Sequence, residues 1–338
     1  MKQLNHKQLK EFLKVAYNKK ISTYIWGAFG IGKSAVVKQV SEELNIRLID
    51  VRVSQLEPSD VRGLPKIENN TTKWFYPNWL PAEDKGILFL DEINLAVPSI
   101  QASLYQLILD RRIGDYILPK DWFVVCAGNR LEDKANIFEL PSPLANRFVH
   151  IELKIPSVKE WQNWAFDNDI SEKIIAFLNF KPEYLFKFDS KYKDKSIPTP
   201  RSWAFCSSLI KDVNGEELLD NLISSSVGEG VAIEMNAFLR LRKTIDIKDL
   251  IENPNKIKEI EEIGLKWALL SAITEYYKQN KEEKIFRNII KICKLLEAEY
   301  TFLLLKFIIK VDKEYFRKEV KNNKEADELV KKLIDFAI

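Results

Sequence analysis

The sequence predicts an α/β protein with a three-layer αβα core around a five-stranded parallel sheet, followed by an α-helical lid and a C-terminal helical region. Three observations lead to this prediction. Short apolar runs alternate with amphipathic stretches in the first half of the chain, as in parallel sheets covered by helices on both faces. After Pro156 the apolar residues recur with helical spacing almost without interruption. The 338 residues also exceed the size at which one hydrophobic core usually stops growing.

Five short segments have the composition of buried strands, because Ile, Leu, Val or aromatic residues dominate each of them. The predicted strands are Ser22–Trp26, Arg47–Val51, Gly86–Leu90, Trp122–Cys126 and Val149–Leu153. Amphipathic stretches lie between them, with Ser34–Leu44 and Ser99–Asp110 as the clearest helices. We therefore predict that residues 1–155 form the αβα core.

The second half is predicted to be helical. It opens with a stretch in which Trp161, Trp164 and Ala165 share one helix face. Lys181–Arg201 is rich in proline and charge and is predicted to be a loop that leads into a helix. The expected division is a helical lid over 156–246 and a C-terminal helical extension over 247–338.

Composition places limits on function. With 52 Lys and Arg against 49 Asp and Glu, the net charge is only +3, far from the strongly basic field of a dedicated nucleic-acid binder. Cys126, Cys206 and Cys293 are widely separated and lack zinc-site spacing, which favours a reducing compartment. His6 and His150 are isolated histidines without metal-ligand spacing, so no role is predicted for them. The charged N-terminal stretch and the lack of long apolar runs predict a cytoplasmic protein.

The string GAFGIGKS over residues 27–34 is the strongest motif in the chain. It fits the pattern G-x-x-x-x-G-K-[ST], follows a predicted strand and opens a predicted helix. Backbone N–H groups and the positive end of the helix then face an anion. Lys33 is expected to contact the outer phosphates of a nucleotide, and the Ser34 hydroxyl to bind Mg²⁺.

A second motif lies at the end of the predicted Gly86–Leu90 strand, where four apolar residues run directly into Asp91 and Glu92. Open α/β sheets bind ligands at this edge. Asp91 is expected to hold Mg²⁺ together with Ser34, and Glu92 to orient or deprotonate the attacking water.

These motifs resemble those of the AAA+ ATPases, P-loop NTPases that use ATP and Mg²⁺, and within them the MoxR-like branch. The resemblance covers roughly the first 240 residues. It implies that Asn129, at the end of the fourth predicted strand, is a sensor that positions the lytic water, although an Asn there also suits a plain turn. It implies that the nucleotide is bound by a set of loop and strand-end residues. These are Gly27, Ala28, Phe29, Gly30, Ile31, Gly32, Lys33, Ser34, Ala35 and Asp91.

Two arginines complete the set of residues that the resemblance implies to be catalytic, beside Glu92 and Asn129. Arg147 is similar to an arginine finger, which reaches the nucleotide of a neighbouring subunit and so requires an oligomer, a ring of six by resemblance. An intramolecular salt bridge is the alternative for this side chain. Arg201 is similar to a second sensor that contacts the γ-phosphate from the lid, although Pro200 beside it also suits an ordinary helix start.

Two insertions point to the same branch. Residues 54–85 resemble its helix-2 insert, with a hairpin-like centre around Glu68–Thr71, and residues 111–121 resemble its pre-sensor hairpin. In related rings both project toward the central pore. Trp74, Phe75 and Trp79 could there grip a substrate chain or, equally, pack beneath the loop.

The function expected from these features is ATP hydrolysis in a ring that remodels or activates a partner protein. The resemblance suggests a partner with a von Willebrand factor A domain, which the sequence itself does not identify. A nucleic-acid-directed AAA+ motor or loader is the alternative, and the near-neutral charge stands against it. Tyr24, Ile25 and the predicted Leu4–Leu13 helix are core residues or part of an adenine pocket.

Overall fold

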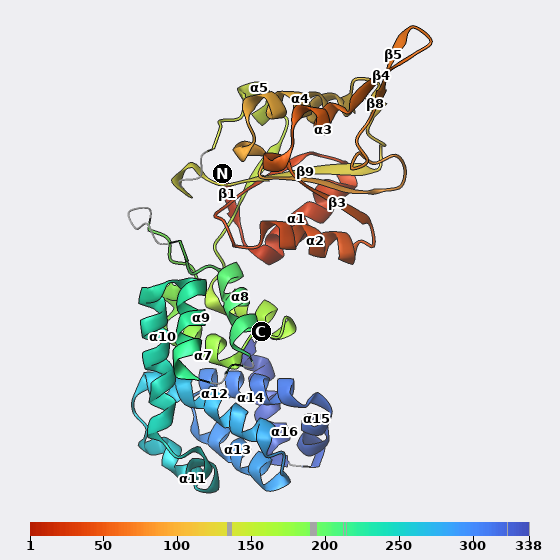
Figure 1. Cartoon of the computed structure of the whole chain (residues 1–338). Helices are drawn as coiled ribbons and strands as arrows, with labels where there is room; N and C mark the ends of the chain where they lie inside the picture. Colours follow the sequence, from red (N-terminus) through yellow and green to blue (C-terminus); the bar gives the residue numbers. More distant parts are fainter. Residues whose placement is uncertain (134–136, 190–194, 212, 214, 323, 338) are drawn as a thin grey trace. The chain divides into compact units, whose positions relative to one another are not determined.

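The computed structural model describes residues 1–133, 137–189, 195–211, 213, 215–322 and 324–337. The chain divides into two compact units, Met1–Pro156 and Ser157–Ile338 (Figure 1). The predicted boundary after residue 155 lies beside this division. The further boundary predicted between 246 and 247 stays a prediction. One apolar cluster contains residues from both sides of it, from Val158 to Ala326.

The first unit is built on a parallel sheet with the strand order β1-β10-β2-β9-β6-β3. Its strands are β1 Lys2–Leu4, β2 Thr23–Trp26, β3 Arg47–Arg52, β6 Gly86–Asp91, β9 Trp122–Gly128 and β10 Val149–Leu153. The five predicted strands are all present. The sheet has six strands rather than five, because β1 pairs with β10 at the edge. β1 could not be found from its pattern, since it has three residues, two of them polar and exposed.

Helices cover both faces of this sheet (Figure 1). They are α1 His6–Lys19, α2 Lys33–Glu43, α3 Pro58–Arg62, α4 Pro98–Asp110 and α5 Ser142–Ala145. α1 begins at a capping box in which the Asn5 side chain accepts from the Gln8 backbone N–H and the Gln8 side chain accepts from that of Asn5. Strand side chains alternate between the faces, so Leu88 and Leu90 pack in the cluster that contains the α4 residues, while Ile87 and Phe89 are buried outside that cluster.

Two hairpins interrupt the αβ alternation where the sequence predicts insertions. β4 Leu64–Glu68 pairs with β5 Thr71–Phe75 through Asn69 and Asn70, both at positive φ. Asn tolerates this left-handed backbone better than most residues, which explains the tight two-residue turn. β7 Arg112–Ile113 pairs with β8 Tyr116–Ile117 through Gly114 and Asp115. Figure 1 shows β4 and β5 extending away from the sheet.

The described residues of the second unit form helices joined by turns and loops, without a strand. Its helices are α6 Val158–Asp167, α7 Glu172–Phe180, α8 Pro200–Ile210, α9 Glu216–Val227, α10 Glu229–Leu241, α11 Ile247–Glu252, α12 Ile263–Gln279, α13 Glu283–Leu295, α14 Ala298–Val311, α15 Lys313–Asn322 and α16 Lys324–Ala337. Their apolar faces share one core, in which Trp203, Phe177 and Phe238 are buried. No helix among the described residues is both long and apolar enough to span a bilayer.

Candidate active site

The loop between β2 and α2 has the backbone of an anion cradle. Gly30 and Gly32 adopt φ values of 70° and 98°, which side chains disfavour. A Cβ atom at Gly27 would lie 3.1 Å from the Leu153 carbonyl oxygen of β10, so the loop packs closely against the sheet. α2 begins at Lys33, and its first N–H groups therefore open onto the loop. This geometry suits the binding of phosphate groups.

Lys33 lies inside the loop with only 9% of its surface exposed. Its ammonium group donates to the carbonyl oxygens of Gly27 at 2.8 Å and Ala28 at 2.9 Å. It also donates to Asn129 Oδ1 at 3.0 Å, at the carboxyl end of β9. The structure therefore brings the loop lysine and the predicted sensor amide together.

Ser34 and Asp91 lie together as well. The Ser34 hydroxyl donates to Asp91 Oδ2 at 2.8 Å, and Asp91 Oδ1 accepts from the Glu92 backbone N–H at 2.9 Å. A hydroxyl and a carboxylate are hard oxygen ligands of the kind that Mg²⁺ prefers, so these residues fit the predicted metal. Among the described residues, no group of three or more His, Cys, Asp or Glu side chains is placed to hold a metal ion by itself.

Glu92 has an unusual backbone conformation directly after β6. Its φ of 57° lies in the left-handed region, which is uncommon for a residue with a side chain and is often found at functional sites. The Ser54 hydroxyl donates to Glu92 Oε2 at 2.5 Å. Partial desolvation, together with repulsion from Asp91, raises the pKa of the neighbouring Asp50 carboxyl. Negative charge is thus concentrated at this end of the sheet.

Asn94 is a site residue that the sequence analysis missed. Its side chain is fully buried, donates to the Asn129 carbonyl oxygen at 2.8 Å and accepts from the Asn129 backbone N–H at 3.2 Å. This pair of bonds fixes the Asn129 backbone. In the sequence, the only sign of this role was an Asn two residues after Glu92. Its partner Asn129 lies 35 residues away in the chain, so the pairing could not be predicted.

The other loop residues predicted to bind the nucleotide differ in their exposure. Ala28 and Ile31 are buried, Phe29 is partly buried and Ala35 is exposed. His6, for which no role was predicted, lies beside the loop, with its Nε2 atom 2.7 Å from the Ile31 carbonyl oxygen.

The two predicted arginines are both exposed. Arg147 lies between α5 and β10, and the described residues offer its side chain no hydrogen bond or ion pair. Leu144 and Phe148, on either side of it, are buried, so the segment is anchored while Arg147 stays exposed. Arg201 is the second residue of α8, behind the capping box of Thr199 and Ser202. Arg201 belongs to the second unit, so it is not part of the geometry described for the first unit.

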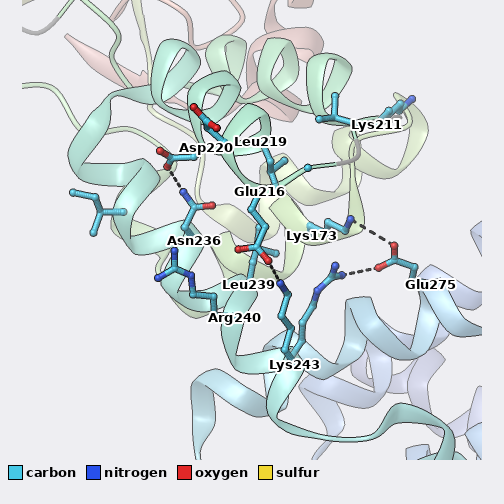
Figure 2. Close-up of a pocket in the computed structure, with 15 residues that line it drawn as sticks. Lys173, Lys211, Glu216, Leu219, Asp220, Asn236, Leu239, Arg240, Lys243 and Glu275 are labelled. Atoms are coloured by element: carbon cyan, nitrogen blue, oxygen red, sulfur yellow. Dashed lines mark hydrogen bonds and ion pairs between the residues drawn. The ribbon is translucent and has the colours of Figure 1, made fainter.

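The second unit contains a cavity of about 940 Å³ between helices (Figure 2). Lys173 Nζ and Arg242 Nη1 both approach the Glu275 carboxylate there, at 3.7 Å and 2.6 Å. Desolvation lowers the pKa of Lys173. Several charges of the lining pair with one another, as Lys243 does with Glu216, and no reaction is assigned to this cavity.

Residues 22–148 match the AAA domain family of the dynein-related subfamily. Among solved structures, a candidate ATPase from Cytophaga hutchinsonii is 14% identical with a TM-score of 0.38, over 66% of this chain and 81% of that chain. A variant of RuvB from Thermotoga maritima is 19% identical with a TM-score of 0.40, over 73% of this chain and 75% of that one. NtrX from Brucella abortus, in complex with ADP, is 16% identical with a TM-score of 0.36, over 82% and 65%. TM-scores this low lend no weight to a functional assignment.

The matched segment contains the whole site built above: the glycine-rich loop, Asp91, Glu92, Asn129 and Arg147. Residues 22–148 therefore correspond to an AAA domain, and the site that they contain is that of an ATP hydrolase.

Proposed function

We propose that this chain is a MoxR-like AAA+ ATPase that hydrolyses ATP in an oligomeric ring, a hexamer by resemblance, to remodel or activate a partner protein. The convergence of two contacts supports the catalytic part of this proposal. Lys33 meets Asn129, and Ser34 meets Asp91, at the carboxyl edge of one sheet. The residues proposed to contact the phosphates, the metal and the attacking water therefore lie in one place.

Each side chain has a defined task in this proposal. Lys33 and the loop N–H groups hold the outer phosphates of ATP. Bound Mg²⁺, held by Ser34 and Asp91, would neutralise charge on the phosphate oxygens. Glu92 orients the attacking water and accepts its proton, and Asn129 directs that water toward the γ-phosphate.

Arg147 is proposed to act on the ATP of a neighbouring subunit. Its exposure, and the lack of an ionic partner for its side chain among the described residues, support this role. Mixing Arg147→Ala subunits with Glu92→Gln subunits tests it, because each is inactive alone and the mixture combines an intact Glu92 with an intact Arg147. Recovery of ATPase activity is expected, and a mixture as inactive as its components contradicts catalysis between subunits.

Arg201 is proposed to report the nucleotide state to the second unit. Arg201 is exposed at the start of α8, which supports this role. The expected result for Arg201→Ala is slower hydrolysis with ATP binding largely kept, with Arg240→Ala in the same unit as the control.

A protein client is favoured by the β4–β5 hairpin. Leu64, Ile67, Trp74 and Phe75 are exposed there, with 79% of the Ile67 surface open to solvent. Trp79 instead packs against the core, with its Nε1 atom donating to the Asp60 carbonyl oxygen. Capture of a protein by the Glu92→Gln variant with ATP is the expected outcome, and a von Willebrand factor A domain protein is the proposed partner.

A nucleic-acid-directed AAA+ motor is the second candidate, because similar hairpins also occur in motors of that kind. The net charge of +3 argues against it. Stimulation of ATP turnover by DNA that falls steeply with added salt would favour this candidate over a protein client.

A further inference from the structure

His150 connects the strand before the nucleotide loop to the segment before Arg147. The Trp26 indole Nε1 donates to His150 Nδ1 at 2.9 Å, and His150 Nε2 lies 2.7 Å from the Ala145 carbonyl oxygen. Trp26 is the last residue of β2, directly before Gly27, and Ala145 is the last residue of α5. The imidazole therefore bridges two segments that are far apart in the sequence.

The chemistry of the two partners fixes the tautomer of this ring. An indole N–H can only donate, so Nδ1 has to be an acceptor without a proton. Nε2 then carries the proton and donates to Ala145, whose carbonyl can only accept. The ring also lies among aromatic neighbours, with centroids 5.7 Å from Tyr24 and 6.1 Å from both Trp26 and Phe148. Both its orientation and its hydrogen-bonding direction are thus defined.

The Arg147 segment is also tied to the sheet by the pairing of β10 with β2, which begins at Val149. The Val149 backbone N–H donates to Ser22, and the buried side chains of Leu144 and Phe148 anchor the two ends. Between these points, the Ala145 carbonyl lies two residues before Arg147 and accepts from His150 Nε2 and from the Phe148 backbone N–H. The Arg147 backbone N–H itself donates to the Leu144 carbonyl oxygen at 3.1 Å. The imidazole therefore adds a side-chain link from this turn to Trp26 of β2, and its loss is expected to shift the backbone that carries the arginine.

We propose that His150 is a positioning residue for Arg147. Within one subunit, His150 holds the arginine in the position that it needs to act at the ATP site of the next subunit. It also links the position of the arginine to β2, the strand before the glycine-rich loop. This inference rests on the proposed catalysis between subunits. A displacement of about 1 Å in a charged catalytic group is enough to reduce a rate by one to two orders of magnitude.

The test uses the subunit mixture described above, because it separates the subunit that supplies Arg147 from the subunit that hydrolyses ATP. His150→Phe is introduced either into the Glu92→Gln subunits, which only supply the arginine, or into the Arg147→Ala subunits, which only hydrolyse. Phenylalanine keeps a ring among the aromatic neighbours and removes both hydrogen bonds. ATP binding and the midpoint of thermal unfolding are measured for each subunit.

A positioning role predicts an asymmetric result. ATPase activity of the mixture should fall about tenfold when His150→Phe is in the arginine-supplying subunits, and stay within about twofold when it is in the hydrolysing subunits. His150→Gln in the arginine-supplying subunits should restore much of the loss, since its amide can donate to Ala145 and accept from Trp26.

Equal losses in both arrangements, or a loss confined to the hydrolysing subunits, overturn the inference and leave catalysis between subunits intact. An unmodified mixture without activity overturns both proposals at once. The two failures are therefore distinguishable.

Discussion

The Ser54 hydroxyl donates a 2.5 Å hydrogen bond to the carboxylate of Glu92, which the proposed mechanism needs for the attacking water. This bond occupies one carboxylate oxygen, so it competes with the attacking water for that oxygen. Ser54→Ala should raise the basal ATPase rate about twofold to fivefold, in line with a net hydrogen-bond contribution of about 0.5–1 kcal/mol. Steady-state phosphate release measures this, with the neighbouring exposed Gln55→Ala as the control. A lower rate in Ser54→Ala shows instead that the serine holds Glu92 in its working position.

Asn94→Ala should destabilise the first unit and slow hydrolysis together. The substitution leaves the backbone N–H and carbonyl of Asn129 without their buried partner, which costs about 2 kcal/mol. Denaturant unfolding and ATPase assays on the same samples measure both effects. Asn18→Ala, at an exposed position of α1, should leave both unchanged. If Asn94→Ala loses stability but keeps full activity, the Asn129 amide needs no such support.

Gly128→Ala should destabilise the protein because a Cβ atom there would overlap the Tyr24 hydroxyl and the Asn94 side chain. The Tyr24 hydroxyl is buried and has no hydrogen-bond partner within the described residues. Tyr24→Phe alone should therefore be neutral or stabilising by about 1 kcal/mol, and it should recover part of the Gly128→Ala loss. Thermal unfolding of the two single variants and the double variant measures the coupling, with Gly230→Ala, where the space is open, as the control. Simple additivity of the two changes contradicts this account.

The three cysteines should resist alkylation in the folded protein. All are buried, and desolvation raises the pKa of Cys206 to about 12 and also raises the pKa of Cys126 and Cys293. At pH 8 almost none of each is therefore thiolate, the reactive form. Thiol titration with and without denaturant checks this, with no reaction expected before unfolding and three thiols after it. Rapid labelling of the native protein at Cys206 would show that the second unit opens locally.

The sequence predicted the parts of the site that are contiguous in the chain. The glycine-rich loop, Lys33 and Ser34 form one string, and Asp91 and Glu92 end one apolar strand, so local pattern was enough to find them. It did not predict the bond between Ser54 and Glu92 or the bonds between Asn94 and Asn129. The fold joins residues 38 positions apart in the first contact and 35 positions apart in the second.

His150 illustrates the same limit more strongly. Its partners Trp26 and Ala145 lie 124 and 5 residues away, and an isolated histidine gives no sign of either. The edge strand β1 was not predicted, for a different reason. Lys2–Leu4 has no alternation of apolar and polar residues, and its strand structure depends on pairing with β10.

The two large apolar clusters have a consequence for how the molecule responds to heat. One cluster draws its residues from Tyr24 to Phe148 and the other from Val158 to Ala326. Each half of the chain therefore has its own hydrophobic core. A calorimeter scan should accordingly resolve two melting steps. Saturating ATP analogue should displace the step that belongs to the amino-terminal half, because a ligand raises the melting temperature of the body that binds it.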